Sequence, residues 1–203
     1  MTLYFVRHGQ SEANLLNEFS NRGMKHGLTE KGFAQARELA QSLQGVKITK
    51  VYTSPLLRAF QTARIVAKEQ NVSLEQTDAL REYDCGVLEG RSDAHSWEEY
   101  SRVSDLWLKH GKHGERISAG ESFNDIRRRF EPFIRELTAS NRAGDDSFVL
   151  VGHGGTYRCM LPLVLSNVDH AFAISRGMDH STVVVAESTP RGLACVKWGD
   201  HTF

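Results

Sequence analysis

Four basic side chains in the sequence have the chemistry needed to hold a phosphate group. Arg7 and His8 directly follow an apolar run near the N-terminus, and His153 follows a second apolar run. Arg58 stands in the first turn of an expected helix, where a cation opposes the helix dipole and favours a nearby anion. Arginine's planar fork matches phosphate oxygens, and neutral imidazole is nucleophilic near neutral pH. These residues predict a positive cradle for a dianion, with a histidine as candidate nucleophile.

Phosphoryl transfer of this kind also needs an acid that protonates the leaving oxygen. Glu82 is the candidate, in the charged segment Leu80-Arg81-Glu82-Tyr83-Asp84. A single carboxylate among such neighbours is more often an ordinary surface group. Its role as an acid is therefore a hypothesis that depends on where the fold places it.

The spacing of apolar residues places the basic side chains at the ends of secondary-structure elements. Residues 2–6 and 147–151 are apolar runs typical of buried strands, and each ends at a histidine segment. Strands that alternate with helices predict an α/β sandwich with a largely parallel sheet, in which ligands bind at the carboxyl ends of strands. The other expected elements are a helix from Thr29 to a stop at Gly45, a strand near 50–53, a helix over 56–65 with Ser54 as N-cap, helices near 123–137 and 156–165, and strands at 182–187 and 193–198.

Composition restricts the class of protein further. The 203 residues, of which 40% are hydrophobic and 25% charged, fit one ordinary globular domain over 1–203. Basic and acidic residues both number 25, so the global positive field that supports non-specific nucleic-acid binding is missing. No apolar run is long enough to span a membrane, and the N-terminus lacks a signal-peptide pattern. Widely spaced cysteines at 85, 159 and 195 favour reduced thiols, so we expect a cytoplasmic protein.

Seven segments of the chain, in the same order, resemble the histidine phosphatase superfamily, the phosphoglycerate mutase-like proteins. Together they cover most of the chain, and their order makes the resemblance specific. It implies a three-layer α/β/α sandwich with a mostly parallel central sheet. The segments are Arg7-His8-Gly9-Gln10-Ser11-Glu12-Ala13-Asn14, Leu28-Thr29-Glu30-Lys31-Gly32, Ser54-Pro55-Leu56-Leu57-Arg58-Ala59-Phe60-Gln61-Thr62-Ala63, Leu80-Arg81-Glu82, Leu88-Glu89-Gly90, Gly120-Glu121-Ser122 and Val151-Gly152-His153-Gly154-Gly155.

The resemblance also implies a role for each candidate residue. It implies phosphoryl transfer without metal or cofactor, through a phosphohistidine formed on His8. Glu82 would donate a proton to the leaving group and then, as a carboxylate, activate the attacking water. The groups that would hold the phosphoryl oxygens are the side chains of Arg7, Asn14, Arg58 and His153 and the backbone amide of Gly154.

The residues after the acid favour a phosphatase over a mutase. Phosphoglycerate mutases of the family typically carry Glu-Arg-His-Tyr-Gly at this point, where the arginine and tyrosine help to bind the substrate carboxylate. This chain has Glu82-Tyr83-Asp84-Cys85-Gly86, and the charge of Asp84 is expected to repel a carboxylate. Mutases are also generally longer. We therefore expect a phosphatase acting on small phosphomonoesters such as sugar phosphates, with a mutase or a non-catalytic phospho-ligand binding module as alternatives.

Specificity is expected in two segments that would cover the pocket, the loop 17–27 and a helical insert at about 90–120. Candidate wall residues are Phe19, Tyr83, Trp97 and Trp107, for which ordinary packing is an equally good explanation. A second anion could meet Arg22, Lys25, Arg102, Lys109, Lys112 or Arg116, although solvated surface charges are the simpler explanation. His180 could approach the pocket. Members of the family are often dimers, and the sequence is compatible with a homodimer without requiring one.

Two other enzyme classes are disfavoured by the residues themselves. The segment Gly152-His153-Gly154-Gly155 resembles the oxyanion loop of lipases, but the chain contains no G-x-S-x-G motif. A zinc site is suggested by nine histidines and by His110 with His113. No cysteine or paired-histidine ligand set completes such a site.

Overall fold

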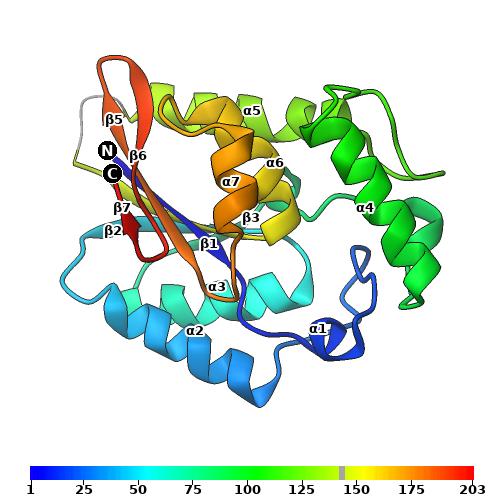
Figure 1. Ribbon diagram of the computed structural model, residues 1–203. Coiled ribbons are helices and arrows are strands. Elements are labelled where there is room, and N and C mark those ends of the chain that lie inside the picture. The colour runs from blue at the N-terminus through cyan, green and yellow to red at the C-terminus, as the bar shows by residue number, and fades with distance from the viewer. Residues whose placement is uncertain (142–144) are drawn as a thin grey trace.

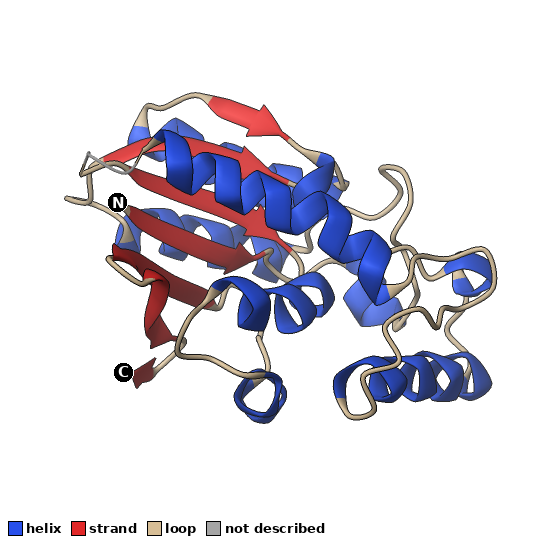
Figure 2. Ribbon diagram, turned by 90° about the horizontal axis from the view of Figure 1, so that it is seen from above, coloured by secondary structure: helices blue, strands red, loops and turns tan. Residues whose placement is uncertain are grey.

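The computed structural model describes residues 1–141 and 145–203. Within these ranges, a central sheet of seven strands lies between two layers of helices (Figures 1 and 2). The strand order is β3-β2-β4-β1-β5-β6-β7. The strands are β1 (Thr2–Arg7), β2 (Ile48–Thr53), β3 (Leu74–Gln76), β4 (Ser147–Gly152), β5 (Val183–Thr189), β6 (Gly192–Trp198) and β7 (His201–Thr202).

The predicted α/β sandwich is confirmed, and the sheet divides into two parts. Strands β3, β2, β4 and β1 pair in parallel, whereas β1–β5, β5–β6 and β6–β7 are antiparallel pairs. The parallel description therefore holds for the half of the sheet that carries the histidine segments. Strands β5 and β6 are joined by two residues, and a connection that short permits only an antiparallel pair.

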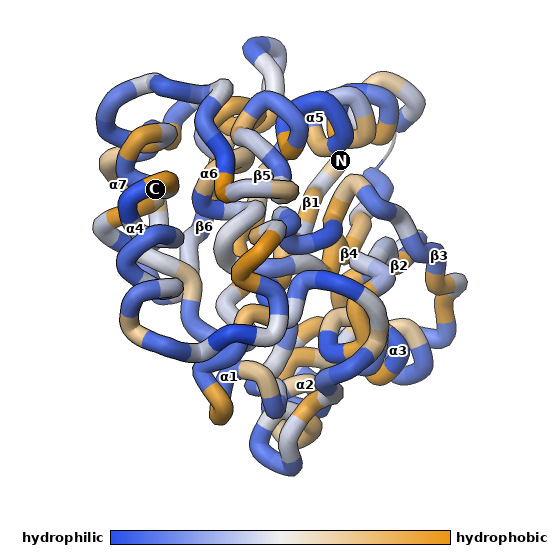
Figure 3. The backbone as a smooth tube through the Cα atoms, turned by 90° about the vertical axis from the view of Figure 1, so that its right-hand side faces the viewer, coloured by the Kyte–Doolittle hydropathy of each residue, from blue (hydrophilic) through white to orange (hydrophobic). Residues whose placement is uncertain are grey.

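The helices cover both faces of the sheet because successive strand side chains point to opposite sides. Leu3, Phe5 and Leu150 pack toward α5 and α6, while Val6 and Val149 pack toward α2 and α3. Figure 3 accordingly shows hydrophobic residues along β4, and hydrophobic and hydrophilic residues that alternate along the helices. The helices are α1 (Glu12–Leu16), α2 (Glu30–Ser42), α3 (Leu57–Gln70), α4 (Ala94–Leu108), α5 (Phe123–Ser140), α6 (Gly154–Val164) and α7 (His170–Arg176), with short 3₁₀ turns η1 (Asp78–Leu80) and η2 (Gly86–Leu88).

The predicted excursion over 90–120 contains helix α4, which stands beside the carboxyl ends of the parallel strands (Figure 1). Asp93 caps its first turn by accepting a hydrogen bond from the backbone N–H of Ser96 over 3.1 Å. The helix reaches back to the loop 17–27, where Trp97 donates to the carbonyl of Asn17 over 3.0 Å. Among the helices of the two described ranges, none is long and apolar enough to cross a membrane.

Candidate active site

The two histidine segments meet at the carboxyl ends of neighbouring parallel strands. β1 and β4 are paired so that Arg7 lies opposite Gly152, and the backbone N–H of His8 donates to the carbonyl of Gly152 over 3.1 Å. The ring centroids of His8 and His153 are 5.0 Å apart, and both side chains are buried. The sheet therefore places two imidazoles side by side at the edge where ligands of α/β proteins bind.

Hydrogen bonds at both ring nitrogens hold the His8 imidazole in one orientation and one tautomer. Its Nδ1 lies 2.6 Å from the carbonyl oxygen of Gly9, which can only accept, so Nδ1 carries the proton. Burial, together with the charges of Arg58 and Arg7, holds the pKa of His8 well below its ordinary value. The ring is therefore neutral near pH 7, and Nε2 carries a lone pair that accepts a hydrogen bond from Nε of Arg58 over 3.1 Å.

Arg58 connects the nucleophile candidate to the loop 17–27. It lies at the start of α3, is buried, and donates to the Ser20 carbonyl over 2.6 Å and to Oδ1 of Asn21 over 3.3 Å. Burial lowers the pKa of Arg58 to about 10, which leaves the guanidinium charged at neutral pH. Its hydrogen-bond partners are neutral groups, so the charge remains available to an anion.

His153 is fixed by Ser54, a residue for which the sequence suggested another role. Helix α3 begins at Leu57 with Leu56 as N-cap, so the prediction of Ser54 as N-cap is wrong. The Ser54 Oγ accepts a hydrogen bond from the backbone N–H of Leu56 over 3.2 Å and lies 2.7 Å from Nε2 of His153. The contact fixes the orientation of the imidazole, because Ser54 can donate to an unprotonated Nε2 or accept from a protonated one. Among the described residues, Nδ1 of His153 has no hydrogen-bond partner.

Glu82 lies at the N-terminus of helix α6. Its Oε1 accepts hydrogen bonds from the backbone N–H and the hydroxyl of Thr156, over 2.7 and 2.9 Å, and Oε2 accepts from the backbone N–H of Gly155 over 2.9 Å. A Cβ at position 155 would stand 2.7 Å from Oε1 of Glu82. The glycine therefore lets the first turn of α6 approach the carboxylate, and the carboxylate stands at the wall of the site.

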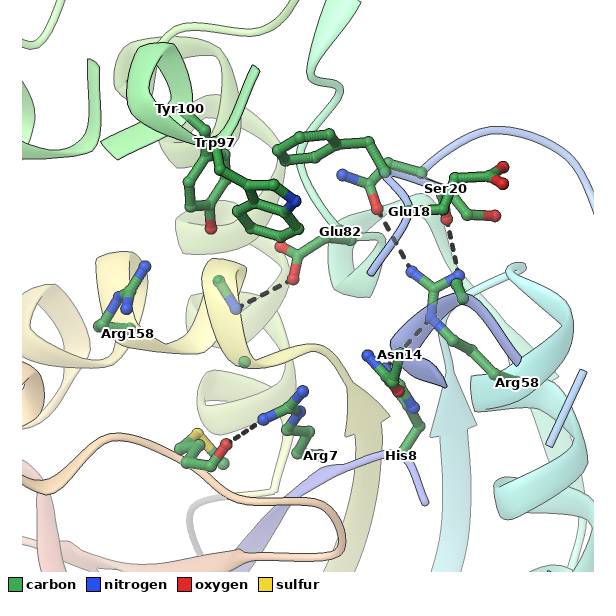
Figure 4. A pocket seen from close by; sticks show the side chains of 16 residues that line it. Arg7, His8, Asn14, Glu18, Ser20, Arg58, Glu82, Trp97, Tyr100 and Arg158 are labelled. Carbon is green, nitrogen blue, oxygen red and sulfur yellow. Dashed lines mark hydrogen bonds between the residues drawn. The ribbon is translucent and has the colours of Figure 1, made fainter. Parts of the chain in front are cut away.

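A cavity of about 300 Å³ joins these groups (Figure 4). Asn14 accepts hydrogen bonds at Oδ1 from the backbone N–H and the hydroxyl of Ser11, and its side chain lies beside His8 and Arg58. His153 is not a lining residue; it is wholly buried against His8. The other predicted site residues all line the cavity, namely Arg7, His8, Asn14, Arg58, Glu82 and Gly154.

Aromatic side chains form the wall of the cavity opposite Arg7, His8 and Arg58. Phe19 stacks on Trp97 with ring centroids 4.2 Å apart, and both line the cavity together with Tyr100. Tyr100 was not an expected wall residue, and it reaches the cavity because it follows Trp97 by three residues on one face of α4. Two expected wall residues do not line the cavity. Tyr83 is buried behind Tyr100, with 5.7 Å between ring centroids, and Trp107 is buried in the core, where its indole N–H donates to a backbone carbonyl.

One basic residue of the cavity was missed by the sequence analysis. Arg158 lines the cavity, and its Nε has no hydrogen-bond partner among the described residues. It lies four residues after Gly154, one turn along α6 on the same face, and this spacing is the signal that could have identified it. The basic residues considered for a second anion are elsewhere: Arg22, Lys25, Arg102, Lys109 and Arg116 pair with carboxylates, and Lys112 is exposed.

His110 and His113, which suggested a zinc site, lie outside the cavity, and so do the three cysteines. His110 is exposed, and His113 stacks on Phe123 with ring centroids 4.1 Å apart. The cysteines at 85, 159 and 195 are buried, and burial raises the pKa of each thiol. Across residues 1–141 and 145–203, no group of three or more histidine, cysteine, aspartate or glutamate side chains is arranged to hold a metal ion.

Comparison with known proteins agrees with this fold. Residues 3–201 match the family model described as histidine phosphatase superfamily (branch 1). A protein of Hydrogenobacter thermophilus named "Putative phosphoserine phosphatase 2" is 32% identical over 166 residues, which cover 80% of this chain and 77% of that protein. A "Probable phosphoglycerate mutase" of Yersinia pestis is 33% identical over 178 residues, 84% of this chain and 78% of that protein. The chain belongs to the histidine phosphatase superfamily.

Solved structures show the same fold. A mycobacterial glucosyl-3-phosphoglycerate phosphatase in complex with VO3 superposes with a TM-score of 0.80 at 22% identity. The superposition covers 99% of this chain and 98% of that one. At this level of identity the likeness concerns the arrangement of strands and helices, and it extends over the whole chain.

Proposed function

We propose that this protein is a metal-independent phosphatase that hydrolyses small phosphomonoesters through a phosphohistidine on His8. The observation that carries the proposal is the state of His8. Its Nδ1 donates to the Gly9 carbonyl, its ring is neutral, and its Nε2 lone pair, which accepts from Nε of Arg58, lies in a cavity lined by arginines. A neutral imidazole with its Nε2 lone pair beside guanidinium groups is arranged to attack a phosphoryl dianion.

Two steps complete the reaction. In the first, Nε2 of His8 bonds to phosphorus as the bond between phosphorus and the ester oxygen breaks, and the protonated Glu82 gives its proton to that oxygen. In the second, water attacks phosphorus, the Glu82 carboxylate takes a proton from the water, and the phosphorus–nitrogen bond breaks. Phosphate leaves, and both side chains return to their starting states. Arg7 and Arg58 stabilise the charge on the phosphoryl oxygens in both steps.

The surroundings of Glu82 bear on the choice between water and a second hydroxyl as acceptor. The expected repulsion by Asp84 is not part of the reason, because Asp84 pairs with Arg22 at 2.9 Å and does not line the cavity. What supports a phosphatase is that the residue after Glu82 is Tyr83, a buried side chain, where mutases of the family carry an arginine.

Arg158 supports a substrate with a second acidic group. Its Nε has no partner among the described residues, and it lines the same cavity as the phosphate cradle, together with Trp97 and Tyr100. The relative named as a phosphoserine phosphatase acts, by that name, on an ester that also carries a carboxylate. Small acidic phosphate esters of this kind, together with the buried thiols, support a cytoplasmic location.

The proposal is tested by phosphate release in EDTA across sugar phosphates, phosphoserine, 3-phosphoglycerate, nucleotides and an aryl phosphate. We expect hydrolysis by the wild type, none by His8→Ala, and wild-type rates for His95→Ala, which removes an exposed histidine. A phosphoryl label that passes from substrate to the wild-type protein, is released by acid and is absent from His8→Ala would support the phosphohistidine. Hydrolysis by purified His8→Ala, or faster conversion of 3-phosphoglycerate to its 2-isomer than release of phosphate, would refute the proposal.

A further inference from the structure

The turn that precedes β5 closes directly on the end of β1. The backbone N–H of Ser181 donates to the carbonyl of Arg7 over 3.1 Å, and the N–H of Arg7 donates to the carbonyl of Thr182 over 3.1 Å. Ser181 has a φ of 63°, in the left-handed region that side-chain-bearing residues rarely adopt. Such a conformation persists only where surrounding contacts hold it. The turn is therefore fixed against the strand that leads to Arg7 and His8.

This turn supplies two acceptors to the Arg7 guanidinium. Nη1 of Arg7 donates to the carbonyl of Met178, and Nη2 lies 3.3 Å from Nε2 of His180. Arginine has donors only, so Nε2 of His180 must be the acceptor and the ring must be neutral. Burial, with the charge of Arg7, lowers the pKa of His180 to about 4, so the ring is neutral at pH 7.

Arg7 lines the cavity together with His8, and its Nε is buried at the cavity wall. Its Nε has no hydrogen-bond partner within the described residues. A Cβ at Gly154 would stand 3.4 Å from this Nε, which places the free edge of the guanidinium beside the backbone of Gly154. The turn thus takes one N–H from each terminal nitrogen of Arg7, and the second N–H of each is left for a phosphoryl oxygen.

We propose that His180 is a positioning residue, whose Nε2 accepts a hydrogen bond from Arg7 and so orients the guanidinium toward a phosphoryl group bound at His8. The inference rests on the proposed function. His180 itself does not line the cavity, and its ring centroid is 6.3 Å from that of His8. An arginine oriented in advance loses less conformational freedom when the anion binds, which strengthens binding without a new contact.

Orthovanadate binding, measured by calorimetry, tests the role because it requires no turnover. His180→Phe keeps a ring and removes the acceptor, whereas His180→Gln places an amide oxygen at about the distance of Nε2 from the backbone. We expect His180→Phe to weaken vanadate binding about tenfold, in keeping with the loss of a hydrogen bond to a charged group. His180→Gln should recover most of that affinity, and thermal unfolding of each variant monitors the fold.

A double-mutant cycle with Arg7 separates positioning from a structural role in the turn. In an Arg7→Ala background, His180→Phe should weaken vanadate binding no further, because the group that it positions is gone. Unchanged affinity in His180→Phe, or an equal loss in both backgrounds, would overturn the inference while leaving the proposed function intact. Absence of vanadate binding by the wild type would overturn the proposed function and this inference with it.

Discussion

Replacing Ser54 by alanine tests how the second histidine is held. The substitution removes the hydroxyl that lies 2.7 Å from Nε2 of His153 and also accepts from the backbone N–H of Leu56. His153 and Ser54 are both wholly buried, so water cannot replace the lost partner. Leaving a buried polar group unpaired costs about 1–3 kcal/mol. We expect the free energy of unfolding of Ser54→Ala to fall by that amount.

The same substitution should also reduce catalysis. Without the Ser54 hydroxyl, Nε2 of His153 loses its hydrogen-bond partner and the ring loses its fixed orientation. We expect kcat/KM to fall about tenfold, which corresponds to about 1.4 kcal/mol of transition-state stabilisation. Nitrogen NMR should find a single tautomer of His153 in the wild type and a mixture of tautomers in the variant.

The assays are urea unfolding and steady-state hydrolysis of an aryl phosphate. Ser104→Ala, which alters a buried serine of α4, is the matched control and should leave kcat/KM unchanged. Wild-type stability and kcat/KM in Ser54→Ala would refute the reasoning, because both effects derive from the same hydrogen bond.

Three further perturbations follow from the site. Burial, with the charge of Arg58, lowers the pKa values of His8 and His153 in the folded protein. Below about pH 6.5 these two histidines are therefore protonated in the unfolded chain and stay neutral in the folded one, which favours unfolding. Urea unfolding should show a free energy of unfolding that falls from pH 7 to pH 5. Arg158→Ala should raise KM for phosphoserine about tenfold and leave KM nearly unchanged for an aryl phosphate that carries no second acidic group. Equal effects on both substrates would contradict a role of Arg158 in binding a second anion. Gly155→Ala should lower kcat by about tenfold or more, because a Cβ there would stand 2.7 Å from Oε1 of Glu82 and displace the acid; a wild-type kcat would contradict it.

The strand ends and the residues of the phosphate cradle could be predicted from the sequence because they are local features. An apolar run that stops at a histidine marks a strand end, and the observed β1 and β4 end within a residue of the predicted positions. The short strand β3 and helix α7 were missed, since three and seven residues carry little periodicity.

His180 was expected only as a residue that could approach the pocket, and the contacts between the site residues and their partners could not be predicted, because the partners come from distant parts of the chain. His180 is 173 residues from Arg7, and Ser54 is 99 residues from His153. Nothing in the spacing of a sequence indicates which side chain of a distant turn will meet an arginine. Likewise, Trp107 had the same apolar character as Trp97, and only the packing of α4 decides that one is buried in the core and the other lines the cavity.

A net charge of zero conceals a cavity rich in arginine. Basic and acidic residues are equal in number, yet the cavity is lined by Arg7, Arg58 and Arg158. Many surface arginines and lysines pair with carboxylates, whereas Arg58 donates to neutral oxygens of the loop 17–27. Charge that is left unpaired by the fold at one place is what an incoming dianion can neutralise. Affinity for phosphate esters therefore depends on whether these arginines are neutralised by carboxylates of the protein, rather than on the net charge of the chain.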